Sequence, residues 1–177
     1  MKKFFSILGL ILTFFMIYFL QANFFTWFHI AGVKPNLFVV FILFIGLFVG
    51  NKLGFVFGLM LGIYLDLLIG KTVGISGFML GIVGLIGEYL DKNFSKDSRI
   101  TLIFMVMGST AIYELGQYFF QILRWKFDIE ILPFITTLMI EVIFNAVLVI
   151  ILYPLIQKVG NGLEKVFKSK SVLTRYF

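Results

Sequence analysis

Long apolar runs alternate with short polar segments along the whole chain. An α-helix rises 1.5 Å per residue, so about 20 apolar residues cross a hydrocarbon core of about 30 Å. A closed β-barrel would need short segments of alternating polarity, whereas these runs are continuous. The pattern therefore predicts an all-α integral membrane protein with six transmembrane helices. We expect these helices at about 4–23, 36–50, 53–70, 73–90, 100–123 and 131–157.

Prolines and one short polar turn shape the predicted helices. Pro35 precedes the second run, where its missing N–H costs little. A single helix over residues 37–70 would be about 51 Å long, too long for one crossing, so we expect a turn at residues 50–52. Pro154 predicts a kink in the last helix. Residues 1–157 are thus interpreted as one transmembrane domain, and 158–177 as a basic tail.

Glycine is concentrated between Gly46 and Gly87, which hold 11 of the 17 glycines of the chain. Small residues four apart let membrane helices approach closely. The structural interpretation is packing against neighbouring helices of the same bundle, which we favour. The alternative is a docking face for a helix of a partner protein. The row consists of Gly54, Gly58, Gly62, Asp66, Gly70 and Gly74.

Three acidic residues lie inside the predicted membrane helices, where a charge is costly. By helical rise, Asp66, Glu114 and Glu141 lie within roughly 5 Å of one depth, at or beyond the middle of the bilayer. Asn145 lies one turn from Glu141. Each acid could be protonated or hydrogen-bonded within the bundle. Alternatively, these four residues form a buried polar cluster that opens as an outward-facing pocket.

The composition argues against an enzyme. The chain is 60% hydrophobic, contains no cysteine, and has one histidine, His29, in a predicted loop. Neither a phosphate-binding loop nor an HExxH zinc motif is present. We therefore predict no catalytic residue, no cofactor and no metal site. The net charge of +6 comes from basic residues dispersed between apolar runs, so we expect no nucleic-acid partner.

The basic residues also predict an orientation. On the six-helix interpretation, 11 Lys and Arg residues lie on the side of the two termini and 4 on the other side. Cytoplasmic loops carry the excess of Lys and Arg. We therefore expect a multi-pass protein with both termini in the cytoplasm, and a basic tail that contacts anionic lipid at about 1 kcal/mol per basic residue.

Several local motifs, in this order, resemble the MreD family of rod shape-determining membrane proteins, and the resemblance covers nearly the whole chain. The motifs are Lys34-Pro35-Asn36-Leu37, the row from Gly54 to Asp66, Gly74, Gly87-Glu88-Tyr89-Leu90, Asn145 and Tyr153-Pro154-Leu155.

The resemblance implies a location, partners and a fold. It implies a protein of the bacterial cytoplasmic (inner) membrane that acts beside MreC, the actin-like MreB, and the RodA and penicillin-binding-protein synthases. It also implies a fold similar to the S components of energy-coupling-factor vitamin transporters. The family has no established catalytic residues to carry over. The favoured function is a non-catalytic scaffold for peptidoglycan synthesis during cell elongation. The alternative is a small-molecule-binding subunit of a vitamin-type transporter.

Overall fold

The computed structural model describes residues 1–50, 52–69, 73–125 and 130–168. They form an all-α protein with six helices, which confirms the expected fold class. Three of the described segments are long and apolar enough to cross a membrane: Lys2–Thr26, Arg99–Arg124 and Ile131–Phe167. The elements are α1 (Lys2–Ala22), the 3-10 turn η1 (Phe24–Thr26), α2 (Leu37–Phe48), α3 (Leu53–Ile69), α4 (Ile75–Asn93), α5 (Arg99–Trp125) and α6 (Ile131–Phe167).

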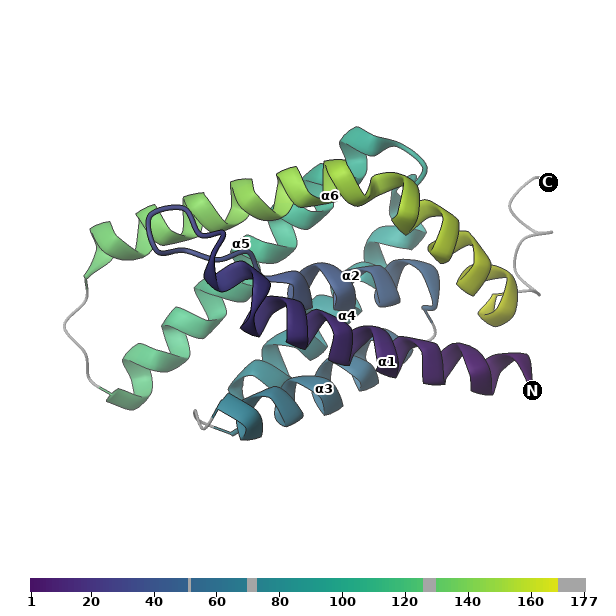
Figure 1. The fold of residues 1–177 in the computed structure, drawn as a ribbon, viewed down its shortest axis with the longest axis horizontal. Coiled ribbons are helices and arrows are strands. Elements are labelled where there is room, and N and C mark those ends of the chain that lie inside the picture. Colours follow the sequence, from purple (N-terminus) through teal and green to yellow (C-terminus); the bar gives the residue numbers. More distant parts are fainter. Residues whose placement is uncertain (51, 70–72, 126–129, 169–177) are drawn as a thin grey trace.

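Helix α2 is the centre of the bundle (Figure 1). It contacts all five other helices, and ten of its twelve residues are buried. A helix that is apolar on every side is typical of such a central position. It is shorter than the expected 36–50 because both its ends are fixed by local structure. Asn36 caps the first turn by accepting the N–H of Val39 at 3.4 Å, and Gly50 has a positive φ of 60°.

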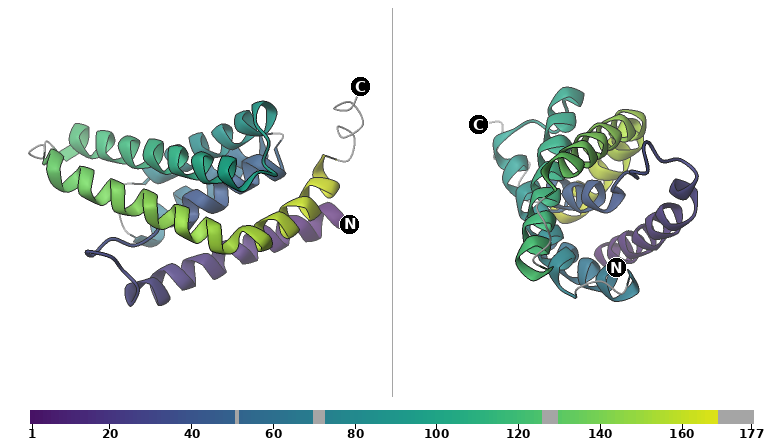
Figure 2. Two further views of the ribbon diagram at one scale, coloured as in Figure 1. Left: turned by 90° about the horizontal axis from the view of Figure 1, so that it is seen from above. Right: turned by 90° about the vertical axis from the view of Figure 1, so that its left-hand side faces the viewer.

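Helices α3 and α4 form the closest pair, and α4 also packs extensively on α2. These three helices contain eight glycines, most of which meet the backbone of a neighbouring helix, so their backbones approach one another directly. Helices α5 and α6 form a second pair, and α1 lies along the outside of the bundle (Figures 1 and 2). The start of α1 and the end of α6 lie at the same end of the molecule (Figure 2).

Helix α6 is longer than the sequence suggested. It continues for ten residues beyond the expected end at residue 157, to Phe167, with Pro154 inside it. The helix bends along its length (Figure 2), as expected where proline removes a backbone hydrogen bond and crowds the preceding turn. The first part of the predicted tail is therefore helical.

Candidate functional site

The glycine row of α3 lies against backbone of α2 and α4. A Cβ atom at Gly54 would come within 2.8 Å of the Gly46 Cα, and one at Gly62 within 2.5 Å of the Gly77 Cα. A Cβ atom at Gly58 would overlap the carbonyl of Leu80 on α4. Real Cβ atoms do not approach backbone this closely, so this face is filled by neighbouring helices of the same chain. Gly70 lies outside the described residues.

Asp66, at the end of this row, binds the start of α4. It is 2% exposed, and its Oδ2 atom accepts the backbone N–H of Gly74 at 2.8 Å and of Ser76 at 3.1 Å. The first N–H groups of a helix have no partner within the helix, and they carry a partial positive charge that favours a carboxylate. Gly74 adopts a φ of 103° at the N-cap, which glycine does without strain. The carboxyl group therefore holds the last turns of α3 against the start of α4.

A chain of polar side chains continues from α4 to α5. The Gln117 side chain donates to the hydroxyl of Ser76 at 3.1 Å and to the hydroxyl of Tyr113 at 3.0 Å. Tyr113 lies close enough to Glu114 and Glu141 to interact electrostatically with both carboxyl groups. The hydrogen bonds of Asp66 go to the backbone at the start of α4, and the side-chain hydrogen bonds of Ser76, Gln117 and Tyr113 continue from there to α5.

Glu114, Glu141 and Asn145 come together where α5 and α6 meet. Asn145 is fully buried; its Oδ1 accepts the N–H of Asn36 at 2.8 Å, and its Nδ2 donates to the Thr110 hydroxyl at 3.0 Å. One turn away, the buried carboxyl of Glu141 interacts with Glu114 and with the Asn36 side chain. These contacts connect α5, α6 and the start of α2. Among the described residues, no group of three His, Cys, Asp or Glu side chains could hold a metal ion.

The densest group of charges lies at the end of the molecule that holds the start of α1 and the end of α6. We call Asp91, Lys96, Glu164 and Lys168 the terminal ionic cluster. Asp91 bridges both lysines, through 2.8 Å to Lys96 and 2.7 Å to Lys168, and Lys96 also binds Glu164 at 2.6 Å. Both ammonium groups donate to one carbonyl near the end of α2, that of Leu47.

The pKa values of the cluster follow from its burial. Burial acts to raise the pKa of Asp91, but the hydrogen bonds and charges of Lys168 and Lys96 outweigh it and hold that pKa below 3.8. Burial disfavours the charged form of Lys168 and lowers its pKa from 10.5, although Asp91 opposes the shift. From the sequence, both lysines are interpreted as topology signals, and Lys168 also as part of a basic tail that contacts anionic lipid. The i,i+4 spacing of Glu164 and Lys168 was the one local sign that they pair.

The end of α6 is attached to the bundle by more than this cluster. The Tyr153 hydroxyl and the Gln157 amide donate to the carbonyls of Asp97 and Lys96, both at 2.6 Å. Gly160 is buried against the ring of Phe48 on α2, which a Cβ atom at this position would meet at 2.7 Å. One face of α6 from Tyr153 to Lys168 therefore packs along the segment between α4 and α5.

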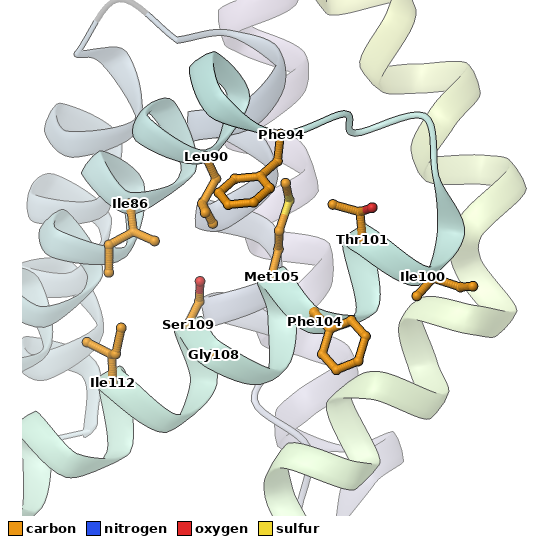
Figure 3. A pocket seen from close by; sticks show the side chains of 10 residues that line it. All are labelled: Ile86, Leu90, Phe94, Ile100, Thr101, Phe104, Met105, Gly108, Ser109 and Ile112. Carbon is orange, nitrogen blue, oxygen red and sulfur yellow. The ribbon is translucent and has the colours of Figure 1, made fainter.

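An apolar groove of about 480 Å³ lies between α4 and α5 (Figure 3). We call it the α4–α5 groove. Aliphatic and aromatic side chains form its walls, and Gly108 and Ser109 form part of its floor. The full lining is Ile86, Leu90, Phe94, Ile100, Thr101, Phe104, Met105, Gly108, Ser109 and Ile112. The sequence pattern gives no sign of this groove, since a groove depends on how two helices diverge in space.

Comparison with known proteins gives one family. The model of the family described as rod shape-determining protein MreD matches residues 1–159 of the chain. No curated protein and no solved structure matches it. The expected likeness to S components of vitamin transporters accordingly stays a prediction.

Proposed function

Because the chain belongs to the MreD family of rod shape-determining membrane proteins, we propose that it is a non-catalytic scaffold of the cell-elongation machinery. In this proposal it lies in the bacterial inner membrane and holds an MreC-like membrane protein in place. The actin-like MreB and the RodA and penicillin-binding-protein synthases then assemble with it, directly or through that partner. On this proposal, the protein acts by positioning its partners during peptidoglycan synthesis.

One observation supports a scaffold above all: two of the most deeply buried polar side chains, Asp66 and Asn145, connect helices to one another. Asp66 joins α3 to α4, and Asn145 joins α6 to α5 and to the start of α2. A catalytic acid or base needs a pKa matched to its task and access to a substrate proton. Groups used up in capping and bridging instead favour a rigid body whose surface does the work.

The arrangement of the ends supports a multi-pass topology with both termini in the cytoplasm. The start of α1 and the end of α6 lie at one end of the molecule, as an even number of crossings requires (Figure 2). The terminal ionic cluster lies at this same end. Exposed Lys158 and Lys165 on the last turns of α6 extend the basic surface that we propose contacts anionic lipid.

The transporter-subunit alternative has one observation in its favour, the contact between Glu114 and Glu141. Two neighbouring carboxyl groups in an apolar bundle attract a cation or share a proton. A ligand site would need both charges, whereas a packing role needs only hydrogen-bonding groups of the same shape. The variants Glu114→Gln and Glu141→Gln therefore separate the two functions.

The test is complementation in a rod-shaped bacterium that lacks its own MreD. We expect the unaltered chain to restore rod shape and to co-purify with the MreC-like protein of that strain. We expect Glu114→Gln and Glu141→Gln, at membrane levels matched by blot, to restore shape as well. Round cells with a normal level of the unaltered chain contradict the scaffold. Round cells with only the two Gln variants favour the ligand-binding alternative.

A further inference from the structure

The glycines of α2 to α5 show which faces of the bundle are already occupied. Ten glycines lie in these four helices, and nine of them meet atoms of a neighbouring element within 4 Å of a Cβ position. The tenth is Gly108, on α5, where a Cβ atom would meet nothing within 4 Å. A glycine inside a helix costs about 1 kcal/mol relative to alanine. At the other nine positions this cost is offset by the close approach of a neighbouring helix that glycine permits. At Gly108, no helix among the described residues makes such a close approach.

The next residue supplies an independent observation. Ser109 is 1% exposed, and its hydroxyl has no hydrogen-bond partner among the described residues. In Figure 3 this hydroxyl points into the α4–α5 groove, toward the side of Ile86 and Leu90. A buried polar group without a partner costs about 1–3 kcal/mol. The groove therefore combines an accessible helix backbone with a hydroxyl that needs a partner.

We propose that the α4–α5 groove is the docking site for one membrane-spanning helix of a partner protein, which presents a small residue to Gly108 and a polar group to Ser109. This inference rests on the proposed function and assigns the partner contact to a place. The glycine row of α3 is not available for it, because α2 and α4 fill that face.

Two other occupants fit the groove less well. An acyl chain would fill the apolar walls but carries no group that bonds to the Ser109 hydroxyl. A second copy of this chain, related by two-fold symmetry, would place one groove against the other, because such an interface uses the same surface on both subunits. Two concave surfaces leave the space between them empty. A single helix fills the groove and can bring a hydrogen-bonding side chain.

The absence of cysteine from the chain permits a crosslinking test without background. Ile112→Cys, in the groove wall, and Leu12→Cys, on exposed α1, are each expressed with the MreC-like protein carrying single cysteines along its membrane-spanning helix. We expect disulfide adducts from Ile112→Cys at partner positions three or four residues apart, because those positions share one helix face. We expect no adduct from Leu12→Cys.

Three further substitutions separate docking from folding. In the Ile112→Cys background, Gly108→Leu should lower the adduct yield by about tenfold, because its side chain occupies the space of the partner backbone. Gly9→Leu is the matched control, since Gly9 also has nothing within 4 Å of a Cβ position. Ser109→Ala should lower the yield about threefold, as expected for one interhelical hydrogen bond. Ser109→Thr, which keeps the hydroxyl, should restore it.

Three results would overturn the groove assignment. They are adducts of twice the mass of this chain, equal adduct yields with Gly108→Leu and Gly9→Leu, or an Ile112→Cys thiol that stays free in membranes containing the partner. The first result identifies a second copy as the occupant, and the last leaves lipid there. If rod shape is still restored by the unaltered chain, the scaffold function stands and only its docking site is refuted.

Discussion

At the scale of single residues, the buried polar groups of this protein act on the ends of helices. Asp66 receives the first N–H groups of α4, and the lysines of the terminal ionic cluster donate to Leu47 at the end of α2. Helix ends leave backbone groups without partners, which is especially costly where water is absent. A charged side chain inside the apolar region is thus explained by the backbone that it satisfies.

This role of Asp66 leads to a prediction with two variants. Asp66→Asn keeps a side-chain oxygen that can accept the N–H groups of Gly74 and Ser76, so we expect normal membrane levels and restored rod shape. Asp66→Leu leaves both N–H groups unpaired, at about 1–3 kcal/mol each, and should lower the level and the shape function together. The measurements are a membrane blot and cell shape in the complementation strain. A well-expressed Asp66→Asn that leaves cells round would show that the charge itself has a function.

The sequence identified Asp66 but could not identify its partners. A carboxylate in a row of glycines stands out in any apolar helix, whereas Gly74 and Ser76 become its partners only through the turn that follows α3. The terminal ionic cluster was missed for a related reason. Asp91 and Lys168 are 77 residues apart, and a lysine in a loop looks the same in the sequence whether it is solvated or buried in an ion pair.

At the scale of helices, close glycine contacts set the geometry of α2, α3 and α4. Spacing alone indicated that the row would face another backbone, because small residues four apart lie on one helix face. It could not tell whether that backbone belongs to this chain. The answer depends on α4 bringing Gly77, Gly81, Gly84 and Gly87 to the same contact. The row is therefore occupied by helices of this chain, and the α4–α5 groove takes its place as the proposed docking site for a partner.

The smallest possible substitution tests this contact. Gly58→Ala adds one methyl group that overlaps the Leu80 carbonyl, a backbone atom that cannot turn aside as a side chain does. We expect a loss of about 1–3 kcal/mol in stability, typical of an overpacked core, and a lower melting temperature in detergent. Gly9→Ala on α1 is the control and should match the unaltered protein. Equal melting temperatures for the two variants would place Gly58 away from any tight contact.

Helix α6 shows where local sequence signals mislead. The sequence predicts a helix to about residue 157 with a kink at Pro154, whereas the helix contains Pro154 and continues to Phe167. Tyr153, Gln157 and Gly160 recur every three or four residues and all contact the bundle, so tertiary packing sustains a helix through a residue that weakens it. In the sequence these contacts appear only as a face of mixed polarity.

At the scale of the whole molecule, the charge pattern and the fold are both consistent with chain ends that lie on one side of the membrane. The excess of Lys and Arg assigns one set of loops to the cytoplasm. The fold brings the start of α1, the end of α6 and the terminal ionic cluster to one end (Figure 2). The end of α5 and the start of α6 lie at the opposite end (Figure 1). The charge count assumed six crossings, and the position of the start of α1 and the end of α6 at one end of the bundle fits that assumption. We therefore propose that the bundle crosses the membrane along its long axis.

Cysteine labelling tests that orientation, because the chain has no cysteine of its own. Lys92→Cys replaces an exposed side chain at the end that holds both helix termini, and Glu130→Cys replaces an exposed residue just before α6, at the opposite end. A membrane-impermeant maleimide should label Glu130→Cys in intact spheroplasts and Lys92→Cys only after the membrane is opened. Among the described residues, Lys92 pairs with Glu88, one turn away on the surface. Such a pair contributes at most about 1 kcal/mol, so the substitution should leave the fold intact. Labelling of both sites from outside would mean that the two ends of the bundle lie on the same side of the membrane, and the six-crossing topology would then be wrong even though the helical fold is right.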